Sequence, residues 1–285
     1  MSWQGPGVGL VIVAPLIHKP RAGPTFVGRP GRYYTPVPRF KDQAICIRDL
    51  DWSESSQLVV LLTREHGKIR GLAKGSRRAS PSAVARFCGG INLLNTGQVI
   101  ATTRATTQLA AITEWNLQND AFHLRTDLQA QWLAMYAADV VNAMLADEDP
   151  HAQTFDALTH LLADLADPDA HQAALLRFQW ALLVDCGLRP ALDEDVSTGQ
   201  PLGKTSTYTF DPQLGGFTTR QGINDTAWRV RVATIHALRD IASGQPTDQT
   251  DPQTRQRANR LLCAYLRAIL DKELPTMPLV LSPMA

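Results

Sequence analysis

The chain has 285 residues, 44% of them hydrophobic, and a formal net charge of +1. This length suits one large domain or two modest ones. Because no run of about 18 apolar residues occurs, we expect no membrane-spanning helix. The four cysteines lie far apart and form no C-x-x-C pair, which argues against a zinc knuckle and against a disulfide framework. We therefore expect a protein of a reducing compartment, the cytoplasm.

The near-zero net charge conceals an uneven distribution. Residues 1–40 carry five basic and no acidic residues, and residues 41–112 carry ten basic and five acidic ones. Residues 113–188 carry two basic and twelve acidic residues, and the remainder is nearly balanced. This asymmetry indicates a basic part that faces a polyanion and an acidic part that faces something else. The alternative is two solvated surfaces without a partner.

The first 40 residues are rich in Gly and Pro and show no periodic element. We expect a disordered basic extension there. No methionine occurs between Met1 and Met135, so a misassigned start near Val37 is a second explanation of this segment.

Residues 41–115 contain short β-rich runs. AICIRDL, QLVVLLT and KIRGLAK are separated by WSESS and EHG, and INLLN and QVIATT, joined by Thr96-Gly97, precede QLAAITEW. Five or six short strands with regular turn signals predict a small barrel or sandwich.

From Asn116 the apolar spacing becomes helical. One helix is expected around residues 128–144, a second around 155–165, and a nearly all-apolar third over 172–184 that should form the spine of a helical domain. Residues 191–224 have a strand-and-turn character, and helical periodicity resumes over 230–241 and 259–270. The sequence thus predicts an α+β chain: a β domain over 41–115, helices over 116–190, a β-hairpin insert over 191–224, and further helices over 225–285.

The densest basic cluster is HGKIRGLAKGSRR. It contains Lys68, Arg70, Lys74, Arg77 and Arg78 on a strand and the following loop. Strand alternation places Lys68, Arg70 and Lys74 on one face, with Ile69 toward the core. Such a basic strand and loop on a small barrel is suited to binding nucleic-acid phosphates, while the alternative is an edge strand protected by charge. Only Trp52 and Phe87 are aromatic in residues 41–112, which predicts phosphate contacts with little base readout.

Signals for catalysis are weak. His66 adjoins a turn glycine, and the histidines at 151, 160 and 171 are better explained by surface salt networks than by a metal site. Gly203-Lys204-Thr205 resembles the end of a phosphate-binding loop, but three residues instead of four separate Gly199 from Gly203 and no strand precedes it. We expect a binding protein without catalytic residues, and a nucleotide hydrolase is the least favoured alternative.

Residues 44–78 resemble the RecO family of bacterial recombination mediators. The shared pattern is an apolar strand, a Glu-Ser-Ser turn, a second strand ending in Thr-x-x-x-Gly-Lys, and a segment close to Ala-Lys-Gly-x-Arg-Arg. It corresponds here to Glu54, Ser55, Ser56, Thr63, Gly67, Lys68, Lys74, Gly75, Arg77 and Arg78. The order of domains agrees over roughly residues 40–285, whereas the first 40 residues match nothing in the family.

The resemblance implies an N-terminal OB-fold and a helical domain with a small zinc-binding insert. It implies binding of single- and double-stranded DNA, annealing of complementary strands, and help in loading RecA onto DNA coated with single-strand-binding protein (SSB), in the RecF pathway. RecR and the acidic, apolar C-terminal tail of SSB are the implied partners, at the nucleoid, with RecA engaged indirectly. The implied DNA contacts are mainly Lys68, Lys74, Arg77 and Arg78, with Arg64, Arg70 and Arg86 less favoured.

The insert departs from the family pattern. Many members have two C-x-x-C pairs, whose positions here align with Asp195, Thr198, Thr219 and Gly222. One carboxylate cannot supply a tetrahedral zinc site. We therefore expect no metal or other cofactor, with the hairpins held by packing of Tyr208, Phe210 and Phe217.

Two functional hypotheses follow. The first is a DNA-binding recombination mediator with no small-molecule substrate. The second, motivated by the acidic stretch 113–188, is a protein-interaction adaptor whose helical domain binds partners and whose β domain has little DNA affinity.

Overall fold

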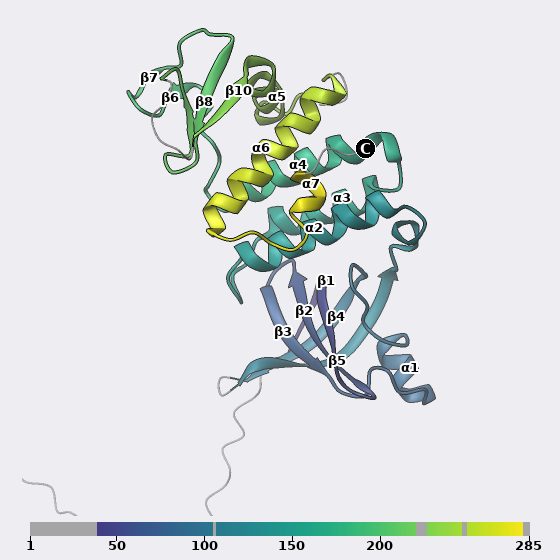
Figure 1. Cartoon of the computed structure of the whole chain (residues 1–285). Helices are drawn as coiled ribbons and strands as arrows, with labels where there is room; N and C mark the ends of the chain where they lie inside the picture. The colour runs from purple at the N-terminus through teal and green to yellow at the C-terminus, as the bar shows by residue number, and fades with distance from the viewer. Residues whose placement is uncertain (1–38, 105–106, 221–226, 247–249, 282–285) are drawn as a thin grey trace, which may run out of the picture. The chain divides into compact units, whose positions relative to one another are not determined.

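A closed five-stranded barrel opens the described part of the chain in this computed structural model, which describes residues 39–104, 107–220, 227–246 and 250–281 (Figure 1). The strands are β1 (Arg39–Ser53), β2 (Ser56–Thr63), β3 (Gly67–Ala73), β4 (Thr96–Arg104) and β5 (Thr107–Asn119). They follow the order β1-β2-β3-β5-β4, with β4 closing onto β1 and β3 parallel to β5. The expected small barrel is confirmed, and it is OB-like.

Alternation along the strands fills the barrel. Cys46, Leu61, Ile69, Val99 and Trp115 are buried in a single cluster inside it. Their strand neighbours point outward. The adjacent pair Leu61 and Leu62 shows the effect, because Leu61 belongs to the barrel core and Leu62 to a second cluster shared with the helices.

The segment between β3 and β4 differs from the expectation. Residues 81–87, PSAVARF, form helix α1 (Pro81–Phe87), whose first turn is capped by the Ser80 hydroxyl, which accepts a hydrogen bond from the Ala83 N–H. INLLN is a turn rather than a strand, since Leu94 has a φ of 65° and the Asn95 N–H donates to the Asn92 carbonyl. Thr96-Gly97 is the start of β4 and not a turn. A Cβ at Gly97 would lie 2.5 Å from the Asn116 carbonyl oxygen, so glycine here permits close packing of strands.

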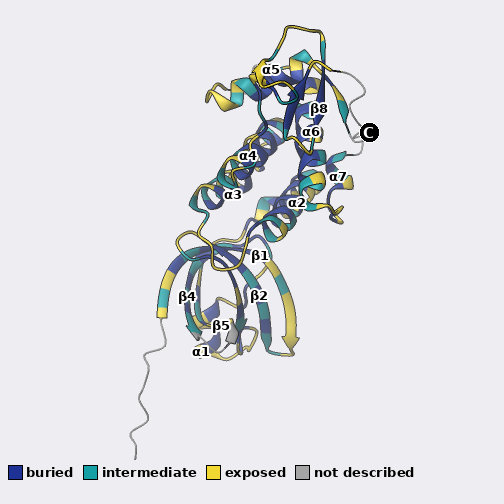
Figure 2. Cartoon of the chain, turned by 90° about the vertical axis from the view of Figure 1, so that its left-hand side faces the viewer, coloured by how far each residue is buried: buried dark blue, intermediate teal, exposed yellow. Residues whose placement is uncertain are grey.

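The helical part contains α2 (Leu128–Met144), α3 (Ala152–Asp164), α4 (His171–Asp185), α5 (Val232–Ala242), α6 (Pro252–Leu270) and α7 (Pro278–Leu281), with short 3₁₀ turns η1 (Phe122–Arg125) and η2 (Pro168–Ala170). The three helices expected before residue 190 are confirmed. Helix α4 is buried along most of its length and packs against α2, α3, α5 and α6, as expected of a spine (Figure 2). No helix in the described ranges is both long enough and apolar enough to cross a membrane.

A small β module interrupts the helices. It consists of the pair β6 (Glu194–Asp195) and β7 (Gln200–Pro201), and of a sheet ordered β10-β8-β9 from β8 (Thr207–Asp211), β9 (Gly216–Thr218) and β10 (Trp228–Arg231). β10 lies beyond the expected insert, and Val230 is in this strand rather than in the helix that was expected to begin there. Pairing of Val230 with Tyr208 explains the difference, since a cross-strand partner overrides the local helical pattern.

The aromatic packing expected for this module is present. Phe210 meets Phe217 edge-on with ring centroids 5.0 Å apart, and it stacks on Trp228 at 5.6 Å. Tyr208, Phe210 and Phe217 are all buried in the core that the module shares with the helices. The expected extension over 1–40 falls outside the described residues as far as residue 38, while Arg39 and Phe40 belong to β1.

Candidate nucleic-acid interface

The loop after β3 is held against the turn between β1 and β2. Gly75, at a φ of 69°, donates its N–H to the Ser56 hydroxyl, and Arg77 donates its N–H to the Ser55 carbonyl. The Ser76 hydroxyl donates to the Gln57 side chain, which itself bonds Ile91 in the barrel interior. The Glu-Ser-Ser turn and the Lys-Gly-x-Arg-Arg segment are therefore one rigid unit at one end of the barrel.

A hollow of about 490 Å³ lies beside this unit. It is lined by Trp52, Ser53, Ser56, Leu72, Lys74, Gly75, Arg78, Ser80, Ser82, Ala83 and Arg86. Lys74, Arg78 and Arg86 are exposed, and none of them has a carboxylate partner among the described residues. The Trp52 side chain is 62% exposed at the same place. We call this group the barrel hollow: three available cations and one exposed aromatic ring.

A neighbouring hollow of about 700 Å³ extends from it along β3 and β5. The two share Leu72, Lys74 and Arg86, and the second continues over residues 109–113 of β5. The face of strands 2 and 3, with the adjoining loops, is where OB-folds bind oligonucleotides. Lys74 and Arg86 thus line both hollows.

Lys68, Arg70 and Arg64 lie elsewhere and have partners in the helical part. Lys68 is 4% exposed, donates to the Asn142 carbonyl at 2.8 Å, and lies 3.2 Å from Asp147. Arg70 pairs with the same carboxylate at 3.0 Å. Arg64 forms two 2.9 Å hydrogen bonds to Asp156 of α3, an ion pair that lowers the pKa of this carboxyl.

The register explains why Lys68 is covered. Leu62 pairs with Ile45 on one side and with Lys68 on the other, so the three side chains share one outer face of the barrel. Ile45 and Leu62 belong to the core cluster of the helices. The alternation predicted for β3 is therefore right, but the helical part covers the end of the face that holds Lys68.

Arg77 points back to β1. Its guanidinium lies 3.7 Å from Asp49 and 3.3 Å from Asp51. Burial raises the pKa of the Asp49 carboxyl, and the charge of Arg77 opposes this rise. Arg77 therefore stands at the margin of the barrel hollow with two carboxylates already beside it.

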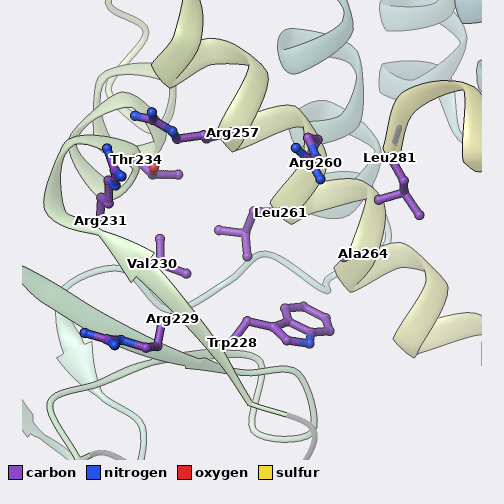
Figure 3. A pocket seen from close by; sticks show the side chains of 10 residues that line it. All are labelled: Trp228, Arg229, Val230, Arg231, Thr234, Arg257, Arg260, Leu261, Ala264 and Leu281. Carbon is purple, nitrogen blue, oxygen red and sulfur yellow. The ribbon is translucent and has the colours of Figure 1, made fainter. Parts of the chain in front are cut away.

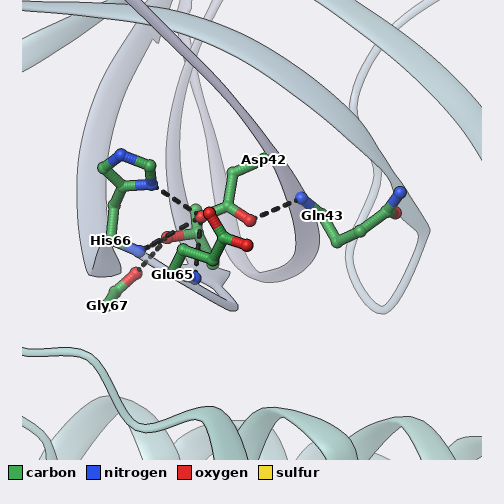
Figure 4. Close-up of polar contacts among 6 residues, drawn as sticks. Asp42, Gln43, Glu65, His66 and Gly67 are labelled. Carbon is green, nitrogen blue, oxygen red and sulfur yellow. Dashed lines mark hydrogen bonds and ion pairs between the residues drawn. The ribbon is translucent and has the colours of Figure 1, made fainter.

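His66 is a turn residue, as the sequence indicated. The buried Asp42 carboxylate accepts hydrogen bonds from the N–H groups of Glu65 and His66 and lies 2.8 Å from His66 Nδ1 (Figure 4). Phe40 stacks on the imidazole with centroids 4.0 Å apart. This network shapes the turn between β2 and β3 and contains no nucleophile.

The described residues of the insert provide no donor set for zinc. Both oxygens of the buried Asp195 carboxylate already accept hydrogen bonds, from the N–H and hydroxyl of Ser197, the Thr218 hydroxyl, and the N–H and hydroxyl of Thr219. Burial alone would raise the pKa of this carboxyl, but these hydrogen bonds outweigh burial and hold the pKa well below its usual range.

Two of the four aligned positions, Asp195 and Thr219, are thus in direct contact, and Thr198 donates its N–H to the Asp195 carbonyl. Gly222 lies outside the described residues. In the described ranges no three His, Cys, Asp or Glu side chains come together as metal ligands. The residues present do not fit a zinc ion.

Gly203-Lys204-Thr205 does not lie between a strand and a helix, as the phosphate-binding loop of a nucleotide site does. It lies between β7 and β8, so a strand follows it where a nucleotide-binding loop requires a helix.

The sequence pattern did not predict helix α1 or the position of Trp52. The Ser-Pro pair at 80–81 is a helix-start signal that could have located α1, which carries Arg86 to the barrel hollow. Trp52 is one of two aromatic residues in 41–112. Its position beside Lys74 and Arg78 depends on the hairpin geometry of β1 and β2.

Comparisons with known proteins agree with this architecture. The family model described as "Recombination protein O N terminal" matches residues 38–120, and "Recombination protein O C terminal" matches residues 125–278. The DNA repair protein RecO of Myxococcus xanthus is 29% identical over 242 residues, which cover 84% of this chain and 96% of the relative. DNA repair protein RecO of Roseiflexus sp. is 31% identical over 242 residues, or 82% of each chain. With the OB-like barrel and the helical part both matched, the chain belongs to the RecO family of DNA repair proteins.

Proposed function

We propose that this chain is a recombination mediator that binds single- and double-stranded DNA at the barrel hollow and anneals complementary strands without catalytic turnover. The observation that carries the proposal is the set of Lys74, Arg78 and Arg86 around one hollow, each exposed and without a carboxylate partner in the described part of the chain. Their location on the ligand-binding side of an OB-like barrel supports it.

The chemistry of the hollow favours phosphate contacts. Guanidinium and ammonium groups neutralise the phosphates of the DNA backbone and release their counterions, whereas the base edges stay accessible for pairing. Trp52 adds one stacking surface that tolerates any base. A protein that neutralises the phosphate backbones of two DNA strands and leaves their bases free can anneal them.

Lys68, Arg70 and Arg64 have a different role in this proposal. Their contacts with Asp147, Asn142 and Asp156 hold the barrel to the helical part. The DNA contacts are assigned to Lys74, Arg78 and Arg86, with Arg77 at the margin.

Membership of the RecO family supports RecR and the acidic C-terminal tail of SSB as partners, with RecA loaded onto the DNA as the outcome. We place the protein at the nucleoid in the cytoplasm on the same basis. None of these roles requires an activated nucleophile or an acid–base pair.

The test compares two matched triple variants of the full chain. Lys74→Gln, Arg78→Gln and Arg86→Gln together should weaken binding of single-stranded DNA by about tenfold or more and reduce the slope of log affinity against log salt by about 2–3. The control removes three other exposed charges, Arg189, Lys204 and Lys272, and should leave both quantities nearly unchanged. Equal losses in the two triple variants, or no loss in the first, would refute the site.

A second candidate function is the adaptor. It is favoured by an exposed apolar group on the acidic helical part, where Phe122 is 60%, Leu128 59% and Trp132 37% exposed. Leu128 and Trp132 are one turn apart on α2. If the native chain anneals no complementary strands but binds purified RecR, and Leu128→Ser with Trp132→Ser abolishes that binding, the adaptor is the correct function.

A further inference from the structure

A basic pocket of about 440 Å³ lies between β10 and α6, in the part of the chain that joins the β module to the helices (Figure 3). It is lined by Trp228, Arg229, Val230, Arg231, Thr234, Arg257, Arg260, Leu261, Ala264 and Leu281. None of these residues lines either hollow of the barrel. We call it the arginine pocket.

Four guanidinium groups surround this pocket, and none of its lining residues is acidic. Arg229 and Arg231 are exposed at alternate positions of β10, which is an edge strand of its sheet. Arg257 and Arg260 come from one turn of α6. Arg257 also faces Asp251, the residue that caps α6, whereas Arg229, Arg231 and Arg260 have no carboxylate partner in the described ranges.

The floor of the pocket is apolar and rigid. Trp228 stacks on Phe210 at 5.6 Å, with an angle of 13° between the rings, and Phe210 is fully buried. Val230 and Leu261 are buried next to it. Because the indole is already held by Phe210, stacking of a ligand ring on Trp228 would cost little additional side-chain entropy.

We propose that the arginine pocket is a second binding site for a nucleic-acid strand. This inference rests on the proposed DNA-binding function and extends it, since one chain would then hold two strands at separate places. A single carboxylate is satisfied by one guanidinium fork. Four guanidinium groups spread over a strand and a helix instead suit a ligand with several charges in a row, and an aromatic floor suits a base.

The decisive measurement is the number of strands bound per chain. Native mass spectrometry at low salt, with an oligothymidylate of about eight nucleotides, a length within the range that one OB-fold covers, should show two strands on the wild-type chain. Arg229→Gln, Arg231→Gln and Arg260→Gln together should leave one, and so should the triple variant of the barrel hollow. All three arginines are exposed, so an unchanged melting temperature is expected and serves as the folding control.

The outcomes separate this inference from the proposed function. If the wild type binds one strand and the arginine-pocket variant still binds it, the inference is wrong and the barrel site stands. If the barrel variant keeps both strands while the arginine-pocket variant loses one, the barrel assignment is wrong and the inference stands. The variant lacking Arg189, Lys204 and Lys272 should still bind two strands.

A second experiment tests the class of ligand. An oligonucleotide carrying 5-iodouracil should form a photocrosslink to Trp228, located by mass spectrometry, and the crosslink should disappear in the arginine-pocket variant. A labelled Asp-Asp-Asp-Phe peptide should not compete with this crosslink at concentrations comparable to the oligonucleotide. Binding of the peptide without crosslinking of the oligonucleotide would show that the pocket takes an acidic peptide, and would overturn the inference.

Discussion

Asp195, which the family pattern aligns with an expected cysteine, accepts five hydrogen bonds from Ser197, Thr218 and Thr219. Its carboxylate thereby ties β6 to the end of β9 across 23 residues of sequence. A metal joins such segments through thiolates. Here a buried anion joins them through hydroxyl and N–H donors.

Replacing this carboxylate should destabilise the fold in a pH-dependent way. The pKa of Asp195 is lower in the folded chain than the value of about 4 expected when unfolded. Its stabilising contribution is therefore fully present above that pH and is lost as the pH falls below it. At pH 7, Asp195→Asn should lower the free energy of unfolding by about 2–3 kcal/mol in urea titrations, and its difference from wild type should shrink in acid.

Glu194→Gln is the control for this prediction, because Glu194 is the exposed neighbour on the same strand. It should change the unfolding free energy very little at any pH. A similar loss in both variants would show that the hydrogen bonds of Asp195 are not the cause.

At the scale of elements, the start of β3 joins the barrel to the loop after α2. The backbones of Lys68 and Asp147 form an isolated parallel β-bridge, and the Glu148 N–H donates to the Lys68 carbonyl at 2.9 Å. Gly67 has a φ of 70°, and a Cβ there would lie 2.2 Å from the Asp149 carbonyl oxygen. Glycine at position 67 is thus explained by the close approach of two backbones, and lysine at position 68 by the partners of its buried ammonium.

Substitutions at the start of β3 should affect stability rather than DNA affinity. Gly67→Ala combines a left-handed backbone with a steric clash and should cost more than about 2 kcal/mol. Lys68→Met should cost about 1–3 kcal/mol, because the Asn142 carbonyl loses its donor while Asp147 keeps Arg70. Thermal unfolding measures both, and a loss of DNA affinity in folded Lys68→Met, with unchanged stability, would contradict this assignment.

At the scale of the whole molecule, part of the acidic stretch 113–188 faces the barrel itself. Asp147 and Asp156 pair with barrel cations, so a part of the uneven charge joins two parts of one chain. The apolar core continues across the same joint, since Ile45, Ile47 and Leu62 belong to the cluster of the helices.

Substitutions at two neighbouring leucines can test whether the apolar core couples the barrel to the helical part. Leu62→Ala should lower the unfolding free energy by about 2–4 kcal/mol and weaken hydrogen-exchange protection in both β2 and α2. Leu61→Ala should cost a similar amount, because Leu61 is equally buried, but its cavity lies in the separate core of the barrel. We expect a larger loss of protection in α2 for Leu62→Ala than for Leu61→Ala, and equal losses would argue against the joint described here.

Much of the fold was predictable because local patterns determine it. Short β-rich runs between turn signals located β1, β2 and β3, and helical spacing located α2, α3 and α4. The errors arose where a distant partner decides the conformation. Val230 is a strand residue because it pairs with Tyr208, and INLLN turns where the Leu94 N–H donates to the Cys46 carbonyl of β1.

The sequence by itself determined the strands of a small barrel or sandwich, the helical spine and the concentration of basic residues after β3, because periodicity and turn chemistry act over a few residues. The OB-fold was implied only by the resemblance to the RecO family. Only the tertiary structure decided which of those basic residues are available. Lys68 and Lys74 belong to the same alternating face, but Asn142 and Asp147 cover the first and leave the second exposed. The availability of a charge depends on segments far away in the sequence, and strand periodicity contains no information about them.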